Sequence, residues 1–251
     1  MCAPSKRMNK NTERRTESGF SLVELAIALT VIGLLLAGLT KGTELINNAR
    51  ADRVVTDLTE ISMAMEAFKR TYGGLPGDLR YVNDRLPNCE NAPCNGNGNG
   101  DWLIGSDSPF SNVSYPATSE MRAFWVQLAK TGYLTTVNTD YTGTNNVPGV
   151  AFPKTPFGGG YRVFANSVTG SFPHIQTNVI RPSRETGTGT LTELFTAPIA
   201  GRIDRKIDDG NPSTGTVRGL TTSGACNSGA NGLYPEAIKG RRCNLLYVLG
   251  R

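Results

Sequence analysis

The sequence predicts an α+β protein in which one long N-terminal helix precedes a loop-rich head with short strands. Helical spacing of apolar residues extends from Phe20 to Tyr72, about 53 residues, which as a helix would be roughly 80 Å long. After residue 134, short strand-like runs alternate with turns. The chain holds 29 Gly and 14 Pro and only 19% charged residues, a composition typical of a loop-rich extracellular domain.

The first half of this predicted helix, Phe20–Thr40, is long and apolar enough to cross a membrane. It contains one charge, Glu24. At a rise of about 1.5 Å per residue, its roughly 21 residues span about 30 Å, the thickness of a bilayer's hydrocarbon core. A carboxylate in such a run is costly in lipid, so Glu24 is a candidate functional residue. Gly33 and Gly38 within the run would allow close helix packing.

The segment before this run is polar and basic and ends in Gly19. An ordinary secretory signal has its apolar region before the cleavage site, whereas here it follows. The order of basic leader, Gly19, Phe20 and apolar helix with an early Glu24 resembles the type IV prepilin signature of pilins and pseudopilins, and the resemblance is strong over residues 15–45. It implies that a prepilin peptidase cleaves between Gly19 and Phe20 and that the new Phe20 amine is N-methylated. An uncleaved single-pass anchor is the alternative.

The resemblance also implies a role for Glu24 in assembly. In pilins this carboxylate meets the N-terminal amine of a neighbouring subunit. Because an unpaired carboxylate is costly in lipid, that pairing would favour the correct stagger between subunits. Many pilins carry a proline just past the apolar run, where this chain has Lys41 and Gly42, so the residue that would kink the helix is absent there.

The fold, the domain boundaries and the function are expected to follow the family. The long helix would pack on a small antiparallel sheet, a pilin-like arrangement. The expected parts are a cleaved leader over 1–19, a helix over 20–72 and a head over 73–251, with the helix divided into a transmembrane and assembly part (20–40) and an amphipathic part (41–72). The expected function is a structural subunit of a type IV pilus or related filament. A type II secretion pseudopilin and a tip-located adhesin or DNA-binding minor pilin are the alternatives.

The expected partners are a prepilin peptidase, other pilin subunits and inner-membrane assembly machinery. The basic leader would hold the N-terminus in the cytoplasm, giving a single-pass protein of the bacterial inner membrane that later joins a periplasmic or extracellular filament. Of the net charge of +5, residues 1–19 contribute +3, so the basic balance argues little for nucleic-acid binding.

Four cysteines follow the apolar helix: Cys89, Cys94, Cys226 and Cys243. An even number beyond a membrane favours disulfides in an oxidising compartment. Three pairings exist, of which Cys89–Cys94 and Cys226–Cys243 are favoured because the members of each pair are close in sequence and lie in turn-rich surroundings. A zinc site is the alternative, but the spacings C-x4-C and C-x16-C lack a tight C-x-x-C pair. In type IV pilins a disulfide near the C-terminus encloses a surface loop, here the residues between Cys226 and Cys243.

Two tracts are candidate calcium sites. The first alternates Asn and Gly like the start of an EF-hand loop but has no glutamate at the twelfth position, which is Ser106. The second is a carboxylate cluster beside a tight turn. For each tract an ordinary turn is the simpler interpretation. The candidate ligands are Asn95, Asn97, Asn99 and Asp101 in the first tract and Asp204, Asp208 and Asp209 in the second.

Within the predicted head, the stretch 73–118 has the composition of a loop and contains a glycosylation sequon at 112–114. An amphipathic helix is predicted over Thr118–Tyr133, capped by Thr118 or Ser119, and a second over Leu191–Ile207, with Pro198 starting or kinking it. On the long helix an apolar stripe at helical spacing is predicted to face the core; it consists of Val54, Leu58, Ile61, Met65, Phe68 and Tyr72. The clearest strands are Gly160–Asn166, Ile175–Ile180 and Asn244–Leu249.

An enzyme is not predicted. His174 is the only histidine, and it lies outside any helical metal-binding spacing. The chain has no G-x-S-x-G motif and no phosphate-binding glycine loop. No cofactor is expected apart from the candidate calcium.

Overall fold

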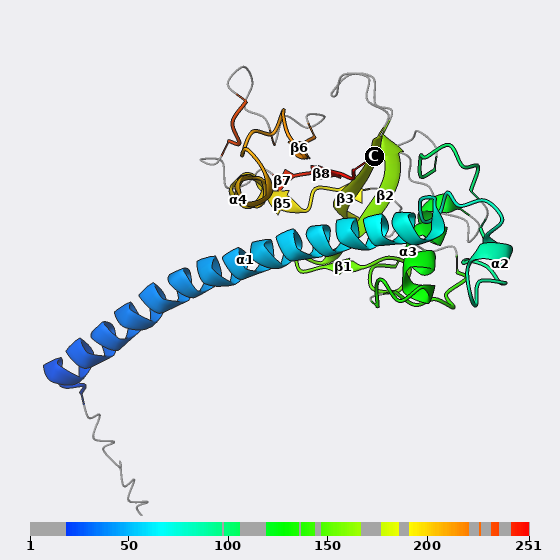
Figure 1. Cartoon of the computed structure of the whole chain (residues 1–251). Helices are drawn as coiled ribbons and strands as arrows, with labels where there is room; N and C mark the ends of the chain where they lie inside the picture. Colours follow the sequence, from blue (N-terminus) through cyan, green and yellow to red (C-terminus); the bar gives the residue numbers. More distant parts are fainter. Residues whose placement is uncertain are drawn as a thin grey trace, which may run out of the picture. The chain divides into compact units, whose positions relative to one another are not determined.

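A computed structural model describes residues 19–96, 98–105, 119–135, 137–143, 147–166, 177–185, 191–220, 226, 232–235 and 242–250 (Figure 1). The chain divides into two compact units, Met1–Leu45 and Ile46–Arg251. The predicted leader residues 1–18, the sequon at 112–114 and His174 lie outside the described residues.

Helix α1, Leu22–Tyr72, is a single run of 51 residues and begins two residues later than predicted. No proline interrupts it. Lys69 and Arg70 lie in its last turn, where cations are favourable beside the partial negative charge of the C-terminus. It ends at Gly73, whose φ of +65° suits a residue without a Cβ and whose N–H donates to the Lys69 carbonyl at 2.9 Å.

The part of α1 in the second unit contributes one face to the core, as the apolar spacing predicts. Val54, Leu58 and Ile61 are at most 3% exposed, and Met65 and Phe68 are fully buried. Tyr72, the last member of the predicted stripe, is half-buried and packs against the same core.

The sheet is antiparallel throughout, which with α1 confirms the α+β class. Its strand order is β1-β2-β3-β8-β6, and β4 pairs with the far end of β3. The longest pairing, β2 with β3, runs in register from Gly160 opposite Ser183 to Asn166 opposite Thr177. The strands are β1 (Lys154–Thr155), β2 (Gly159–Asn166), β3 (Thr177–Glu185), β4 (Leu191–Thr192), β6 (Val217–Gly219) and β8 (Leu245–Val248).

The predicted strand Ile175–Ile180 begins outside the described residues and extends further than expected. Strand β3 continues to Glu185 through Pro182, which lies opposite Tyr161. A proline inside a strand usually ends it, because proline has no N–H to donate to the neighbouring strand. The predicted strand therefore ended before Pro182, whereas β3 continues past it.

The described part of the head also contains three helices and a second, two-stranded sheet. Helix α3 (Glu120–Lys130) begins after Ser119, whose Oγ accepts a hydrogen bond from the Arg122 N–H at 3.3 Å, as the capping prediction allowed. Helix α2 (Val82–Arg85) falls in the stretch predicted to be loop, because a single turn carries no periodic signal. Strands β5 (Phe195–Thr196) and β7 (Arg242–Cys243) pair with each other.

The helix predicted over Leu191–Ile207 is wrong in its first six residues. Leu191–Thr192 and Phe195–Thr196 form strands β4 and β5, the two residues between them belong to no element, and helix α4 covers only Ala197–Ile207. Pro198 lies in the first turn, where its missing N–H costs no hydrogen bond. The proline thus starts the helix, and the apolar spacing before it belongs to extended chain.

Candidate functional site

The three described residues before α1, Gly19, Phe20 and Ser21, are exposed to solvent. The Phe20 side chain is 81% exposed, and a Cβ added to Gly19 would meet no atom within 4 Å. Ser21 caps the helix: its Oγ accepts from the Glu24 N–H at 3.3 Å and its carbonyl accepts from the Leu25 N–H at 3.1 Å. The peptide bond between Gly19 and Phe20 is therefore accessible in this unit.

Glu24 lies in the first turn of α1. A carboxylate is favourable there because the unpaired N–H groups carry partial positive charge. Within the described residues its carboxylate has no ion-pair partner. Among the described residues, the one ion pair along the first unit's stretch of helix joins Lys41 and Glu44, at 3.6 Å.

The apolar side chains from Leu22 to Leu39 are uncovered in this unit. The large ones from Leu22 to Leu39 are between 48% and 90% exposed. Helix α1 is long and apolar enough to cross a membrane, judged by its length and composition. Burial of such a surface requires lipid or another chain, because the hydrophobic effect strongly disfavours leaving it in water.

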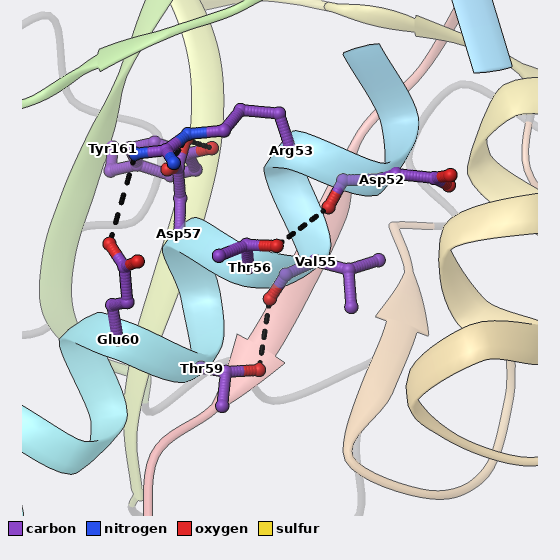
Figure 2. A network of polar contacts seen from close by, with 8 residues as sticks. All are labelled: Asp52, Arg53, Val55, Thr56, Asp57, Thr59, Glu60 and Tyr161. Atoms are coloured by element: carbon purple, nitrogen blue, oxygen red, sulfur yellow. Dashed lines mark hydrogen bonds and ion pairs between the residues drawn. The ribbon is translucent and has the colours of Figure 1, made fainter. Parts of the chain in front are cut away.

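In the second unit, a polar network joins α1 to strand β2 (Figure 2). The Tyr161 hydroxyl donates to Asp57 Oδ2 at 2.8 Å, and Arg53 Nε lies 2.8 Å from Asp57 Oδ1. Arg53 also approaches Glu60, with Nη2 3.8 Å from Oε2. Arg53 and Asp57 meet because residues four apart share one face of a helix. Tyr161 arrives from 104 residues further along the chain.

The network is only partly hydrated, and this changes the acidity of its members. The Asp57 side chain is 13% exposed, and burial raises its pKa above the usual range, although the bonds from Tyr161 and Arg53 act in the opposite direction. Burial and the neighbouring Asp57 carboxylate raise the pKa of Tyr161. Tyr161 therefore stays protonated and keeps donating to Asp57.

An open pocket of about 530 Å³ lies beside this network, within the size range of ligand pockets. Its charged lining comes from Arg53, Asp57, Glu60 and Lys154. Apolar lining comes from Ile61 and Tyr161 on α1 and β2 and from Leu134, Pro153 and Pro156. The lining therefore combines apolar and charged side chains, a mixture that is typical of ligand pockets.

Both predicted disulfide pairings are present in the structure. Cys89 is bonded to Cys94, and Cys226 is bonded to Cys243. All four residues are at most 2% exposed. Cys243 belongs to strand β7, so the second bridge ties the segment containing Cys226 to the small sheet.

The Asn- and Gly-rich tract encloses two carboxylates that the sequence analysis did not connect with it. Asp78 accepts hydrogen bonds from the N–H groups of Gly100 and Trp102, at 2.6 and 2.7 Å. Glu120 accepts from the N–H groups of Asn99 and Gly105, at 3.1 and 2.5 Å. The tract is thus folded around one buried and one partly buried carboxylate, a role that its composition alone does not reveal.

The candidate calcium ligands of this tract have separate partners. Asn99 Nδ2 donates to Asp101 Oδ2 at 2.7 Å, whereas Asn95 Nδ2 donates to the Glu90 carbonyl at 2.8 Å. Asn97 lies outside the described residues. Calcium binding by this tract stays a prediction.

The second candidate calcium site comes together as a cluster. Carboxylate oxygens of Asp204, Asp208 and Asp209 lie within 4.8 Å of one another. Each of them also accepts hydrogen bonds that build the turn after α4. The donors are the Tyr234 hydroxyl and Gly210 N–H to Asp204, the Thr216 N–H to Asp208, and the Asn211 N–H and Thr214 hydroxyl to Asp209. Calcium binding here also stays a prediction, beside an evident structural role.

Comparison with known proteins identifies the N-terminal segment. Residues 14–40 match the prokaryotic N-terminal methylation motif. This motif is the signature of type IV pilins and pseudopilins, and the chain carries it. No curated protein and no solved structure matched the chain. The matched residues include Gly19, Phe20 and Glu24, the three that the sequence analysis assigned to processing and assembly.

Proposed function

We propose that this chain is a structural subunit of a type IV pilus or a related filament. The main support for this proposal is the methylation motif at residues 14–40. Within this motif the structure has an accessible Gly19–Phe20 bond and an apolar helix that is exposed to solvent. A prepilin peptidase would cleave after Gly19 and methylate Phe20. The mature chain would then keep its helix as both membrane anchor and assembly surface.

The motif implies partners and a location. Processing by a prepilin peptidase and assembly with other pilin subunits follow from it. We propose further that the chain first resides in the bacterial inner membrane with its N-terminus in the cytoplasm and later leaves it as part of a filament. Pilin-motif proteins are structural rather than catalytic, which supports a structural role for this chain.

A type II secretion pseudopilin and a tip-located minor pilin that binds a surface or DNA are the alternatives, since all carry the same N-terminus. Immunogold electron microscopy of the mature chain separates them. Labelling along surface fibres supports a pilus subunit, labelling at fibre tips a minor pilin, and labelling confined to the periplasm a pseudopilin.

The deciding experiment is the replacement Gly19→Ala, with intact mass measured after co-expression with a prepilin peptidase. The wild type should yield a chain beginning at N-methylated Phe20, whereas Gly19→Ala should keep residues 1–19. A Cβ at Gly19 meets no atom within 4 Å in the protein itself, so a cleavage defect would report recognition by the peptidase.

Gly33→Ala is the matched control. Gly33 lies in the same helix and also has no atom within 4 Å of an added Cβ, so this variant should mature normally. Normal maturation of Gly19→Ala, or a wild-type chain that keeps its leader, would contradict the proposed function and leave the helix as a plain anchor.

A further inference from the structure

Several asparagines of this chain are followed directly by glycine: Asn95, Asn97, Asn99 and Asn231. In such a pair the backbone nitrogen of the glycine can attack the side-chain carbonyl carbon of the asparagine, because glycine has no side chain to obstruct the approach. Whether a folded chain promotes this attack depends on the groups that contact the reacting atoms. The described residues define these contacts on both sides of the Asn99–Gly100 bond.

The backbone nitrogen of Gly100 is bonded to a carboxylate. Its N–H donates to Asp78 Oδ1 at 2.6 Å. The Asp78 side chain belongs to a residue that is 3% exposed, and burial raises its pKa above the usual range. A carboxylate that binds a proton more tightly is a stronger base. Asp78 is therefore placed to accept the proton of this N–H.

The Asn99 side chain is held at both of its polar atoms. Its Oδ1 accepts from the Asp101 N–H at 2.9 Å, and its Nδ2 donates to Asp101 Oδ2 at 2.7 Å. A donor on Oδ1 withdraws electrons from the carbonyl carbon and stabilises the negative charge that develops on the oxygen during attack. Asn99 is also exposed, so water has access to the product of the attack.

We propose that Asn99 is a site of self-catalysed deamidation, with Asp78 as the general base and the Asp101 N–H as the donor to the oxyanion. The Gly100 nitrogen forms a bond to Asn99 Cγ while its proton passes to Asp78. The bond from Cγ to Nδ2 then breaks, and this nitrogen takes a proton from solvent and leaves as ammonia. Asp78 returns its proton to solvent. One water molecule opens the cyclic imide at either carbonyl, which gives aspartate or isoaspartate at position 99.

The modification changes the surface of the head. It replaces a neutral amide by a carboxylate next to Asp101, which is itself exposed. Opening to isoaspartate also lengthens the backbone by one carbon atom before Gly100. The reaction does not depend on the proposed function, because the nucleophile, the base and the oxyanion donor all belong to the head of a single chain.

Comparing the folded with the denatured full-length chain tests this proposal. Both samples are kept at neutral pH in water labelled with heavy oxygen, one in detergent alone and one with added denaturant, and peptide mass spectrometry follows each asparagine. Asn99 should convert at least about tenfold faster in the folded chain, as expected for general-base catalysis. Conversion of Asn99 that is equal or slower in the folded chain would overturn the proposal.

Asn95 is the control within the same molecule. Its Nδ2 donates to the Glu90 carbonyl at 2.8 Å, and in the described part of the chain no carboxylate is bonded to the Gly96 N–H. Asn95 should therefore convert no faster in the folded than in the denatured chain. An equal acceleration of Asn95 and Asn99 by folding would contradict a role for Asp78.

Two matched variants identify the base. Asp78→Asn removes the carboxylate at the attacking nitrogen and should slow the conversion of Asn99 about tenfold or more. Glu120→Gln removes a carboxylate that accepts from the Asn99 N–H at 3.1 Å and not from the Gly100 N–H, so the rate should stay near that of the wild type. Equal rates in the two variants would show that Asp78 is not the base. If Asp78→Asn does not fold, the comparison of folded and denatured wild type decides the proposal.

Discussion

At the scale of single residues, Asp57 shows how one side chain connects distant parts of the head. Its two carboxylate oxygens accept from Arg53 on the same helix and from Tyr161 on strand β2. A half-buried carboxylate needs such donors because burial without them leaves the charge poorly solvated. The network therefore holds α1 against the sheet beside the pocket.

Removing the Tyr161 hydroxyl should destabilise the protein. Tyr161→Phe deletes a hydrogen bond to a charged, largely buried acceptor, and we expect the free energy of unfolding to fall by about 1.5–3 kcal/mol. Tyr133→Phe is the control, since it removes an exposed neutral hydrogen bond to Thr71 at 2.8 Å and should cost less. Chemical denaturation of the full chain in detergent measures both. If both variants lose the same free energy of unfolding, the charge of Asp57 does not strengthen its hydrogen bond with Tyr161.

The calcium prediction also belongs to single residues. If either acidic tract binds the ion, adding a chelator should lower the unfolding temperature of the full chain, because a ligand that binds only the folded state stabilises it. Asp101→Asn and Asp208→Asn locate the site, since the responsible variant should lose the response to chelator. If the chelator leaves the unfolding temperature of the wild type unchanged, a stabilising calcium ion is excluded.

At the scale of elements, helix α1 serves two environments with one backbone. Between Leu22 and Leu39 its large apolar side chains are about half exposed or more, whereas from Val54 to Phe68 one face is buried in the head. The composition of the sequence distinguishes these two parts of the helix. An all-round apolar surface suits lipid or other helices, and a single apolar stripe suits a protein core.

Glu24 should matter for assembly and not for membrane insertion. Glu24→Ala removes a charge whose burial in a membrane costs about 2.5–3.5 kcal/mol, so insertion should be unimpaired. Filament yield should fall by roughly tenfold, because the proposed pairing with a neighbouring subunit's amine is lost. Membrane fractionation and the yield of sheared filaments measure the two effects.

Glu44→Ala provides the control for this prediction. Glu44 lies on the same helix, is 61% exposed and makes only an exposed contact with Lys41, so its loss should be nearly neutral. Filaments that form equally well with Glu24→Ala would refute the assembly role.

At the scale of the whole molecule, the head holds several buried or partly buried carboxylates. Burial raises the pKa values of Asp57, Asp78, Glu120 and Asp204 above the usual range. Each group then binds its proton more tightly in the folded than in the unfolded chain. Consequently the free energy of unfolding falls as pH rises from about 4, the unfolded pKa of such groups, through the raised folded values.

We therefore expect the head to be more stable in mild acid than at neutral pH. Thermal unfolding of the full chain in detergent between pH 4 and pH 8 measures the trend. Asp57→Asn removes one of the four groups and should make the decline with pH shallower. An unfolding temperature that rises steadily toward neutral pH would contradict burial as the dominant influence on these carboxylates.

Much of the fold was predictable because its signals are local. The 3.6-residue period over Val54–Phe68, the Ser119 cap and the strand-like run at Gly160–Asn166 each depend on neighbouring residues. The errors arose where context overrides the local pattern. Leu191–Thr192 and Phe195–Thr196 were predicted as helix but pair as strands with β3 and β7. Strand β3 continues through Pro182 because the residues on either side of it complete the pairing.

The sequence by itself determined the segment that carries the methylation motif, because Gly19, Phe20, Glu24 and the apolar run are contiguous and their chemistry is read along the chain. Only the tertiary structure decided the pocket and the surfaces around it. Asp57 meets Tyr161 across 104 residues, and Asp78 holds Trp102 across 24. Such contacts depend on how the chain packs its core, and a hydrogen bond between distant residues leaves no periodic mark in the sequence.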